Sequence, residues 1–478
     1  MTQNPPGRRF PRIWLALGLL GCSPSAGGAG SGGTPATGGM TASGGAAASG
    51  GMSASGGSVG SGGAASGGRP GTGGATGGDS GATGGRTSSG GTDAGASGGI
   101  PGGAGRGGTG AGGGRGGGAA GGRDGASGGA TGAGGTPGGT ARFFIGADVT
   151  DQETAPDATR ANLLTIMKAH GFNAVRLRTF VDPKAADGYD KTNGYADIVH
   201  TVAFGRQIKD AGLALLVDFH YSDNWADPGK QCVPIAWQSY TTISDLARAV
   251  HDYTRDSIQK LVTGGARPDL VQIGNETTPG MLIHRCDSAG QPTGMNPITG
   301  QATSANWSNL GALLKAGVDG VREVDAQILV AFHIDRGGDK PADTPGAALQ
   351  TSINWITQAS KYTTFDAFGE SCYQRYQGDP NSAAATKTGW MSTFTGLASM
   401  FPELKLFSAE YGPMQREIND VVFGLARGQG IGTFNWEPTT QGDWNTGHDL
   451  LRRSGSTYTA QPDLSLYDQM KLDYASRL

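Results

Sequence analysis

Two glutamates in this chain are placed where a carboxylate could do acid–base or nucleophilic chemistry. Glu276 ends an apolar run at residues 269–276, and Glu410 ends another at residues 404–410. Such runs are typical of buried strands, and a carboxylate at the end of one must be paired or face a cleft. Two carboxylates flanking one cleft are what glycoside hydrolysis needs: one protonates the leaving oxygen, and the other attacks the anomeric carbon or activates water.

Further polar residues end the other apolar runs, and aromatic residues near them offer flat faces on which sugar rings can stack. Taken singly, each polar residue could be a structural group with its hydrogen bonds satisfied. Because all eight apolar runs end in polar residues, a shared cleft is the favoured interpretation. The chain shows no serine elbow, metal-ligand spacing or phosphate-binding loop. The polar residues are Asp148, Arg176, Arg178, Asp218, His220, Asn275, His333, Asp335, Glu370 and Glu437, and the aromatic ones are Trp225, Tyr373 and Trp436.

The elements that must position these residues follow a repeated order of helix, glycine and strand. Residues 157–170 have helical apolar spacing, stop at Gly171 and lead into a strand-like run, and the order recurs twice directly afterwards. Alternating helices and strands imply a parallel sheet, and eight strands favour a (β/α)8 TIM barrel over a doubly wound sheet, for which no dinucleotide fingerprint is present. The eight predicted strands are 143–147, 173–178, 213–220, 269–276, 328–333, 365–371, 404–410 and 430–436.

Glycine is distributed unevenly along the 478 residues, and this divides the chain. Most of the 88 glycines precede residue 141, in a Gly/Ala/Ser/Thr-rich stretch with few large apolar residues. Such a stretch cannot bury enough apolar surface to offset the entropy of ordering it. We therefore expect a disordered tether at residues 23–140 and one catalytic (β/α)8 domain at residues 141–478.

The first 22 residues resemble a targeting segment. Arg8, Arg9 and Arg12 precede an apolar stretch of about ten residues, which suits a signal peptide and is too short to span a bilayer. The sequence LLGC at 19–22 resembles a lipobox, which makes Cys22 the expected lipidation site; an ordinary secretory signal is the alternative. Either way we expect export, as a bacterial outer-membrane or cell-surface lipoprotein or as a secreted protein.

Charge and cysteine content limit the functions further. The net charge of −3 provides no basic stripe for nucleic acid and no polybasic membrane patch, so membrane contact is expected through a lipid anchor only. Once Cys22 is set aside, three cysteines remain, which allows at most one internal disulfide. Cys232 and Cys286 are the preferred pair, because both fall in loops expected to lie side by side, and this leaves Cys372 free.

Six segments, in order along residues 143–450, carry a family resemblance. They are GAD at 146–148, VRLR at 175–178, DFHYSDNWADP at 218–228, IGNE at 273–276, NLGALLKAG at 309–317 and NWEP at 435–438. Together they resemble glycoside hydrolase family 53, the endo-β-1,4-galactanases, with the 218–228 block the most specific. The resemblance implies retaining hydrolysis of β-1,4-galactan, the side chain of type I arabinogalactan and pectin.

The resemblance also implies roles for individual residues. Glu276 in GNE would be the acid/base and Glu410 in SAEYG the nucleophile, and a nearby Arg176 would favour the charged form of Glu410. The expected substrate-binding residues are Arg176, His220 (orienting a carboxylate or hydroxyl), Asp223 and Asp227 (holding their loop or binding hydroxyls), Trp225 (stacking on a sugar), Asn275 (binding the 2-hydroxyl in the −1 subsite), Tyr373 and Trp436 (the floor of that subsite).

One departure from the family concerns the sixth predicted strand. Residues 368–376 read FGESCYQRY, whereas the family typically has two adjacent tyrosines and a proline after the serine, so Cys372 replaces an aromatic residue. Side chains alternate between the faces of a strand. Tyr373 is therefore expected on the other face, unable to replace a tyrosine that binds the nucleophile unless the strand contains a bulge.

The remaining expectations concern ligands and partners. The loop after the eighth strand lacks a recognisable set of ligands for the calcium that some bacterial members carry there, so we expect no required cofactor or metal and leave a structural calcium ion open. Galactan or arabinogalactan is the expected partner of a monomeric protein. The alternatives are another clan A β-glycanase, acting on mannan, xylan or a different galactan, and a polysaccharide-binding lipoprotein on a degenerate barrel, against which the retained pair of glutamates argues.

Overall fold

The computed structural model describes residues 142–440 and 449–478. The predicted signal peptide with Cys22, the tether at 23–140 and the first residue of the predicted catalytic domain lie outside the described residues. Within the described part, no helix is both long and apolar enough to cross a membrane.

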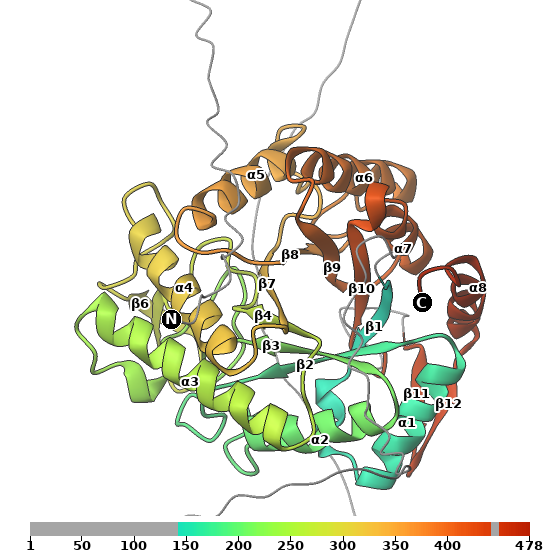
Figure 1. Ribbon diagram of the computed structural model, residues 1–478, viewed down its shortest axis with the longest axis horizontal. Helices are drawn as coiled ribbons and strands as arrows, with labels where there is room; N and C mark the ends of the chain where they lie inside the picture. The colour runs from blue at the N-terminus through green and yellow to red at the C-terminus, as the bar shows by residue number, and fades with distance from the viewer. Residues whose placement is uncertain (1–141, 441–448) are drawn as a thin grey trace, which may run out of the picture. The chain divides into compact units, whose positions relative to one another are not determined.

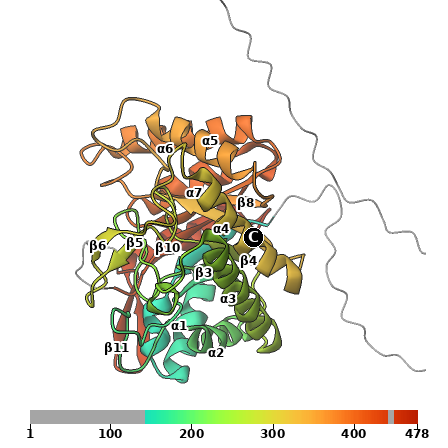
Figure 2. The ribbon, with the colours of Figure 1, turned by 90° about the vertical axis from the view of Figure 1, so that its left-hand side faces the viewer.

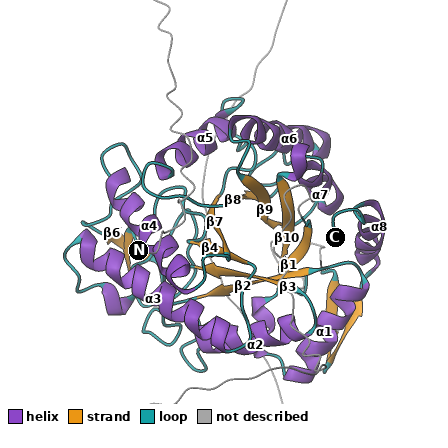
Figure 3. Cartoon of the chain, in the orientation of Figure 1, coloured by secondary structure: helices purple, strands orange, loops and turns teal. Residues whose placement is uncertain are grey.

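Eight parallel strands form a closed barrel surrounded by helices, so the predicted (β/α)8 fold is confirmed (Figures 1 and 3). Around the barrel the strands follow the order β1-β10-β9-β8-β7-β4-β3-β2. Each overlaps one of the runs predicted from the sequence. The barrel strands are β1 (Phe144–Asp148), β2 (Ala174–Thr179), β3 (Ala214–Phe219), β4 (Leu270–Ile273), β7 (Leu329–Ile334), β8 (Ala367–Cys372), β9 (Lys405–Tyr411) and β10 (Gly430–Trp436).

The strand residues divide into two layers because side chains alternate along a strand. One apolar cluster fills the lower interior of the barrel, including Ala174, Leu216, Phe407 and Phe434, and a larger cluster packs the outside of the strands against the helices. Above the interior cluster, the inward positions near the strand ends become polar. The pairing of Asp148 with Arg176 across β1 and β2 begins this polar layer, which forms the floor of the site.

The helices cover the outside of the barrel, as the side view in Figure 2 also shows. Several begin at a capping side chain; Thr242, for example, accepts a hydrogen bond from the Asp245 backbone N–H at the start of α3. Gly171 follows α1 with a φ of +96°, a conformation that suits glycine. The helices are α1 (Asp157–Ala169), α2 (Ile198–Asp210), α3 (Ile243–Thr263), α4 (Trp307–Val324), α5 (Ala347–Ala359), α6 (Ala383–Met400), α7 (Gln415–Phe423) and α8 (Ser465–Asp473).

Two antiparallel hairpins lie outside the barrel, and the sequence did not predict them. β5 (His284–Cys286) and β6 (Pro292–Met295) form the first, in the connection between β4 and α4. β11 (Leu451–Ser454) and β12 (Thr457–Ala460) form the second, which packs beside α1 (Figure 1). Short 3-10 turns at Thr150–Thr154, Ile235–Trp237, Ala426–Gly428 and Pro462–Leu464 complete the described elements.

A disulfide joins Cys232 to Cys286, as the sequence predicted. It ties the loop after β3 to the β5–β6 hairpin. Cys372 is a free, buried cysteine on β8.

Candidate active site

Arg176 is the centre of the polar layer at the C-terminal ends of the strands. Its side chain is fully buried and donates from Nη1 to Asp148 and from Nη2 to Asp218, at 2.9 and 2.7 Å. The same Nη2 lies 3.0 Å from Asn275 Oδ1 and 2.9 Å from Glu410 Oε1. A buried cation requires such carboxylate partners, and sharing one guanidinium fixes the residues around it relative to one another.

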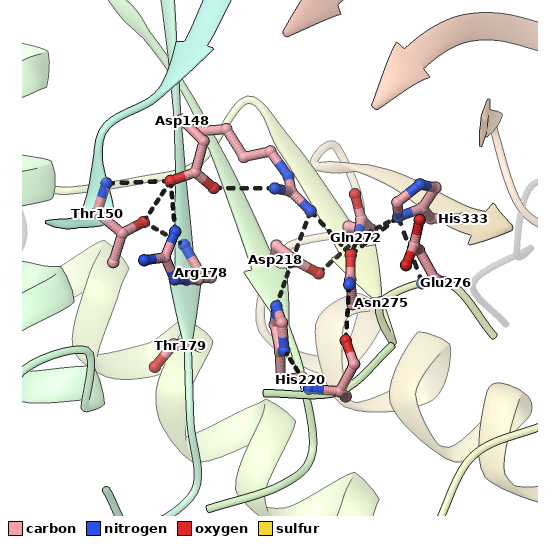
Figure 4. Close-up of polar contacts among 12 residues, drawn as sticks. Asp148, Thr150, Arg178, Thr179, Asp218, His220, Gln272, Asn275, Glu276 and His333 are labelled. Carbon is pink, nitrogen blue, oxygen red and sulfur yellow. Dashed lines mark hydrogen bonds and ion pairs between the residues drawn. The ribbon is translucent and has the colours of Figure 1, made fainter. Parts of the chain in front are cut away.

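The acidic partners of Arg176 are themselves held in place (Figure 4). His220 Nε2 lies 2.9 Å from Asp218 Oδ2, while His220 Nδ1 accepts the backbone N–H of Ala226. Because Nδ1 accepts this N–H, the ring hydrogen lies on Nε2 and faces Asp218. Asp148 in turn accepts hydrogen bonds from Thr150 and Arg178. This layer is a scaffold behind the cleft.

Glu410, at the end of β9, has two polar partners, one cationic and one neutral. Arg176 pairs with Oε1, and the Tyr373 hydroxyl donates to Oε2 at 3.1 Å. Both partners favour the ionised carboxylate, but burial is the larger effect and raises the pKa of Glu410 to about 7. Both oxygens are thus oriented while the side chain still borders the cleft.

Glu276 lies three residues beyond the end of β4, in a backbone conformation with a φ of +46°. The Ser371 hydroxyl lies 2.5 Å from Glu276 Oε1, and His333 Nε2 lies 2.9 Å from the same hydroxyl. Burial and the negative charge of Glu410 raise the pKa of Glu276 well above its usual value. Within the described part of the chain, no lysine or arginine forms an ion pair with Glu276.

The environments of the two glutamates therefore differ in a way that separates their protonation. An arginine favours ionised Glu410, whereas Glu276 faces a hydroxyl and the charge of the other carboxylate. Glu276 keeps its proton at a pH at which Glu410 has lost its own. One acid and one base in a single cleft is the combination that glycosidic bond cleavage uses.

The cleft above these residues has a volume of about 820 Å³ and is lined by polar and aromatic side chains. Trp225 and Trp436 lie side by side with ring centroids 5.8 Å apart, and the guanidinium of Arg178 lies against both rings. The lining residues are Trp225, Ala226, Asp227, Pro228, Lys230, Asn275, Glu276, Asp335, Lys340, Pro341, Tyr373, Arg375, Tyr376, Gln377, Glu410, Trp436 and Glu437.

Seven of the predicted site residues line this cleft, and three lie behind its surface. The seven are Glu276, Glu410, Trp225, Asp227, Asn275, Tyr373 and Trp436. Arg176 and His220 are buried among the strand ends, where they hold other side chains.

Asp223 has one of the two roles expected for it and not the other. It is 1% exposed, and its two carboxylate oxygens accept the backbone N–H groups of Asp182 and Ile235. It therefore holds the loop after β3, and the expected contact with substrate hydroxyls is not present in this arrangement. Asp227, from the same loop, does line the cleft.

Tyr373 also differs from expectation. Along β8, Glu370 points outward and accepts a hydrogen bond from Ser352 of α5, Ser371 points inward to Glu276, and Cys372 packs in the outer apolar cluster. Alternation therefore brings Tyr373 inward, where it contacts Glu410. The prediction was wrong because it assigned the inward position to Cys372.

Ser371 and Gln231 are functional candidates that the sequence did not indicate, and His333 and Glu437 were expected only as polar residues at the ends of apolar runs. Gln231 donates to the backbone carbonyl of Asn275 at 2.8 Å and so supports the turn that carries Glu276. Glu437 pairs with Arg178 at 2.8 Å on the cleft wall. Inward alternation along β7 and β8 is the signal that could have identified His333 and Ser371; a loop residue such as Gln231 has no such signal.

No group of three or more histidine, cysteine, aspartate or glutamate side chains suited to a metal ion occurs among residues 142–440 and 449–478. The expected absence of a required metal stays a prediction.

A (β/α)8 barrel that presents an acid and a base across an aromatic-walled cleft at its strand ends defines this protein as a glycoside hydrolase. Comparison with known proteins identifies its kind. Residues 147–397 match the model of glycosyl hydrolase family 53, and the chain belongs to this family.

Similar proteins span much of the described region. An uncharacterized protein of Niallia circulans is 32% identical over 309 residues, which cover 60% of this chain and 79% of that protein. An arabinogalactan endo-β-1,4-galactanase of Thermothelomyces thermophilus is 28% identical over 305 residues, 58% of this chain and 80% of its own. A solved fungal β-1,4-galactanase shares the fold, with a TM-score of 0.54 and 24% identity over 69% of this chain and all of that one.

Proposed function

We propose that this enzyme hydrolyses β-1,4-galactosidic bonds within galactan and type I arabinogalactan chains, with retention of the anomeric configuration. Family membership and relatives named as endo-β-1,4-galactanases support the substrate. The observation that carries the mechanism is the unequal environment of Glu410, held by Arg176 and Tyr373, and Glu276, held by Ser371.

In the first step, Glu276 would donate its proton to the glycosidic oxygen while Glu410 attacks the anomeric carbon. The bond from that carbon to the leaving oxygen breaks, and a galactosyl ester forms on Glu410. In the second step, Glu276 would accept a proton from water, whose oxygen attacks the same carbon and releases Glu410. Two inversions at one carbon give retention.

The neighbouring side chains support both steps. Asn275 accepts from Arg176 and donates from Nδ2 to the Ala226 carbonyl at 2.8 Å, which fixes its amide beside the cleft to meet the 2-hydroxyl. Trp436 and Trp225 would provide the stacking faces for the sugars on the side of the nucleophile. The buried scaffold of Arg176 and Asp218 keeps this arrangement ready before substrate arrives.

The substrate proposal is tested by the release of reducing ends from linear β-1,4-galactan, with mannan, xylan and β-1,3-galactan in parallel. Activity confined to β-1,4-galactan is expected, with loss in Glu276→Gln and in Glu410→Gln. Cleavage of mannan or xylan in place of galactan would assign another β-glycanase activity. Binding of galactan without any release of reducing ends would identify a polysaccharide-binding protein.

The two roles are tested by adding azide to alanine variants. Glu276→Ala with azide should form β-galactosyl azide, since the ester on Glu410 still forms and azide needs no general base. Glu410→Ala with azide should form α-galactosyl azide by a single inversion. The reverse assignment of products would exchange the roles, and direct formation of α-configured sugar by the wild type would exclude retention.

We also propose that the enzyme is exported and lipidated at Cys22, with residues 23–140 as a tether before the catalytic domain. The arginines and apolar stretch at the N-terminus support export, and the sequence LLGC supports lipidation. Cys22→Ala should move the protein from the membrane fraction to the soluble fraction. A variant that remains in the membrane fraction would rule out the lipid anchor.

A further inference from the structure

Among the described residues that line the cleft, one cationic side chain forms no ion pair with a carboxylate. Three cationic side chains line it: Lys340 lies 2.6 Å from Asp335, Lys230 lies 3.6 Å from Asp227, and Arg375 forms no ion pair with any carboxylate in the described part of the chain. Linear galactan carries no charge. The positive charge of Arg375 therefore has no counterpart on that substrate.

An exposed aromatic ring accompanies this arginine. Tyr376 is 44% exposed and is the one aromatic residue among the large hydrophobic side chains that are exposed in the described residues. The Arg375 guanidinium lies 5.5 Å from the centre of its ring. A ring with a guanidinium over one face can take a sugar on its other face while the guanidinium binds a carboxylate.

Their place in the barrel assigns them to one side of the scissile bond. The loops after β7 and β8 carry Lys340, Arg375 and Tyr376, and these strands lie between β4 and β9 on the short arc of the barrel (Figure 1). Glu276 is hydrogen-bonded to Ser371 on that arc, and the leaving part of the substrate must lie beside the group that protonates it. The tryptophans, Arg178 and Glu437 lie on the opposite arc.

We infer that Arg375 and Tyr376 form a subsite for an acidic sugar, a uronic acid residue in the leaving portion of the galactan chain. Tyr376 stacks on the sugar and Arg375 binds its carboxylate. The inference depends on the proposed galactanase function, and it makes galactan that carries uronic acid a preferred substrate over the neutral chain.

The test compares linear β-1,4-galactan with the same galactan in which part of the C6 hydroxymethyl groups has been oxidised to carboxylates. For each enzyme form, kcat/KM on the oxidised chain is divided by its own kcat/KM on the neutral chain. In the wild type at low salt we expect this ratio to be about three, mainly because KM is lower for the oxidised chain. The ratio should decrease in high salt. In the products, carboxylates should be enriched near the newly formed non-reducing ends.

Arg375→Gln should bring the ratio to about one and remove the enrichment, and Arg375→Lys should keep part of it. Arg206→Gln, on the outer helix α2, changes the net charge equally and should keep the wild-type ratio. Cleavage of both chains with equal kcat/KM by the wild type, or an Arg375→Gln ratio like that of the wild type, would overturn the subsite and leave the galactanase function standing. No cleavage of either chain would overturn both.

Discussion

Ser371, on β8, is the side chain that contacts Glu276, the proposed acid/base. Its hydroxyl is 2.5 Å from Glu276 Oε1 and also contacts His333, whose pKa lies well below its usual value because of burial and the charge of Arg176. His333 is therefore neutral. The hydrogen bond from Ser371 favours ionised Glu276 and so partly opposes the effect of burial on its pKa.

Ser371→Ala should raise the pKa of Glu276 further, because a donor to its ionised form is lost. The high-pH limb of kcat/KM, where Glu276 loses its proton, should move up by about one pH unit or less, and the low-pH limb should not move. Ser352→Ala is the matched control, since it removes a hydroxyl from Glu370, which does not line the cleft. A downward shift of the high-pH limb would contradict the assigned role of the hydroxyl.

Tyr373→Phe should act on the opposite limb. Without the hydroxyl, ionised Glu410 loses a hydrogen-bond donor, so its pKa rises above the value of about 7. The low-pH limb of kcat/KM, where Glu410 becomes protonated, therefore moves to higher pH. The expected shift of the low-pH limb is about one pH unit. Tyr362→Phe, at the other end of the barrel where α5 leads into β8, should leave both limbs in place. An unchanged low-pH limb in Tyr373→Phe would exclude this hydrogen bond in the working enzyme.

At the scale of elements, the loop after β3 supports the turn after β4. Gln231 contacts the backbone carbonyl of Asn275, and the adjacent Cys232 is bonded to Cys286 of the β5–β6 hairpin. The disulfide thus fixes a loop that lies beside both the Glu276 turn and the cleft wall at Asp227 and Lys230.

Removing the disulfide should lower the stability of the domain. Its two cysteines are 54 residues apart, and a loop of this length gives about 4 kcal/mol in the chain-entropy model, or a fall in Tm of roughly 6 °C for a domain of this size. Cys232→Ser/Cys286→Ser should show this fall in a thermal melt, and reductant should reproduce it in the wild type. The Tm of the control variant Cys372→Ala should still decrease with reductant, because this variant keeps the disulfide. A wild-type Tm that reductant does not change would mean that the disulfide contributes no stability.

The barrel strands could be predicted from the sequence because their apolar runs are buried on both faces and end in polar residues. The β5–β6 hairpin could not, since Pro292–Met295 is exposed and has no apolar alternation. The end of β4 was placed too late for a related reason: Gly274, Asn275 and Glu276 continue the run in composition, but positive φ values at Gly274 and Glu276 end the strand at Ile273.

The site, like the fold, could be predicted only in part. Glu276, Glu410 and the tryptophans were identified because they follow strand ends and carry a recognisable chemistry. Tyr373 was placed on the wrong face because the sequence does not show which residues of β8 face the helices. Glu370 does, since its carboxylate accepts a hydrogen bond from the Ser352 hydroxyl of α5. Two roles stayed open for Asp223, because residue type alone does not distinguish a carboxylate that binds backbone N–H groups from one that binds sugar.

At the scale of the whole molecule, the barrel buries carboxyl groups in several separate places. Burial raises the pKa of Glu370, between β8 and α5, and of Glu276 in the cleft well above their usual values. It also raises the pKa of Asp151 to about 7 and of Glu153 to about 8, both in the segment between β1 and α1. Each of these groups binds its proton more tightly in the folded state than in the unfolded chain, so each makes folding stability depend on pH.

Glu153 allows this dependence to be measured outside the cleft. Its Oε2 accepts the Ala196 N–H, and its Oε1 has no hydrogen-bond partner in the described structure. Because its folded pKa is raised, its stabilising contribution is full below the ordinary value near 4.5 and decreases by about 1.4 kcal/mol per pH unit up to about pH 8. The Tm of the wild type should therefore decrease between pH 5 and pH 8. The Tm of Glu153→Gln should decrease less over the same range, and its remaining decrease is due to Asp151 and the other buried carboxyls. The Tm of Glu403→Gln, a variant at the surface, should follow that of the wild type. Equal slopes for Glu153→Gln and the wild type would show that Glu153 is ionised in the folded protein throughout this range.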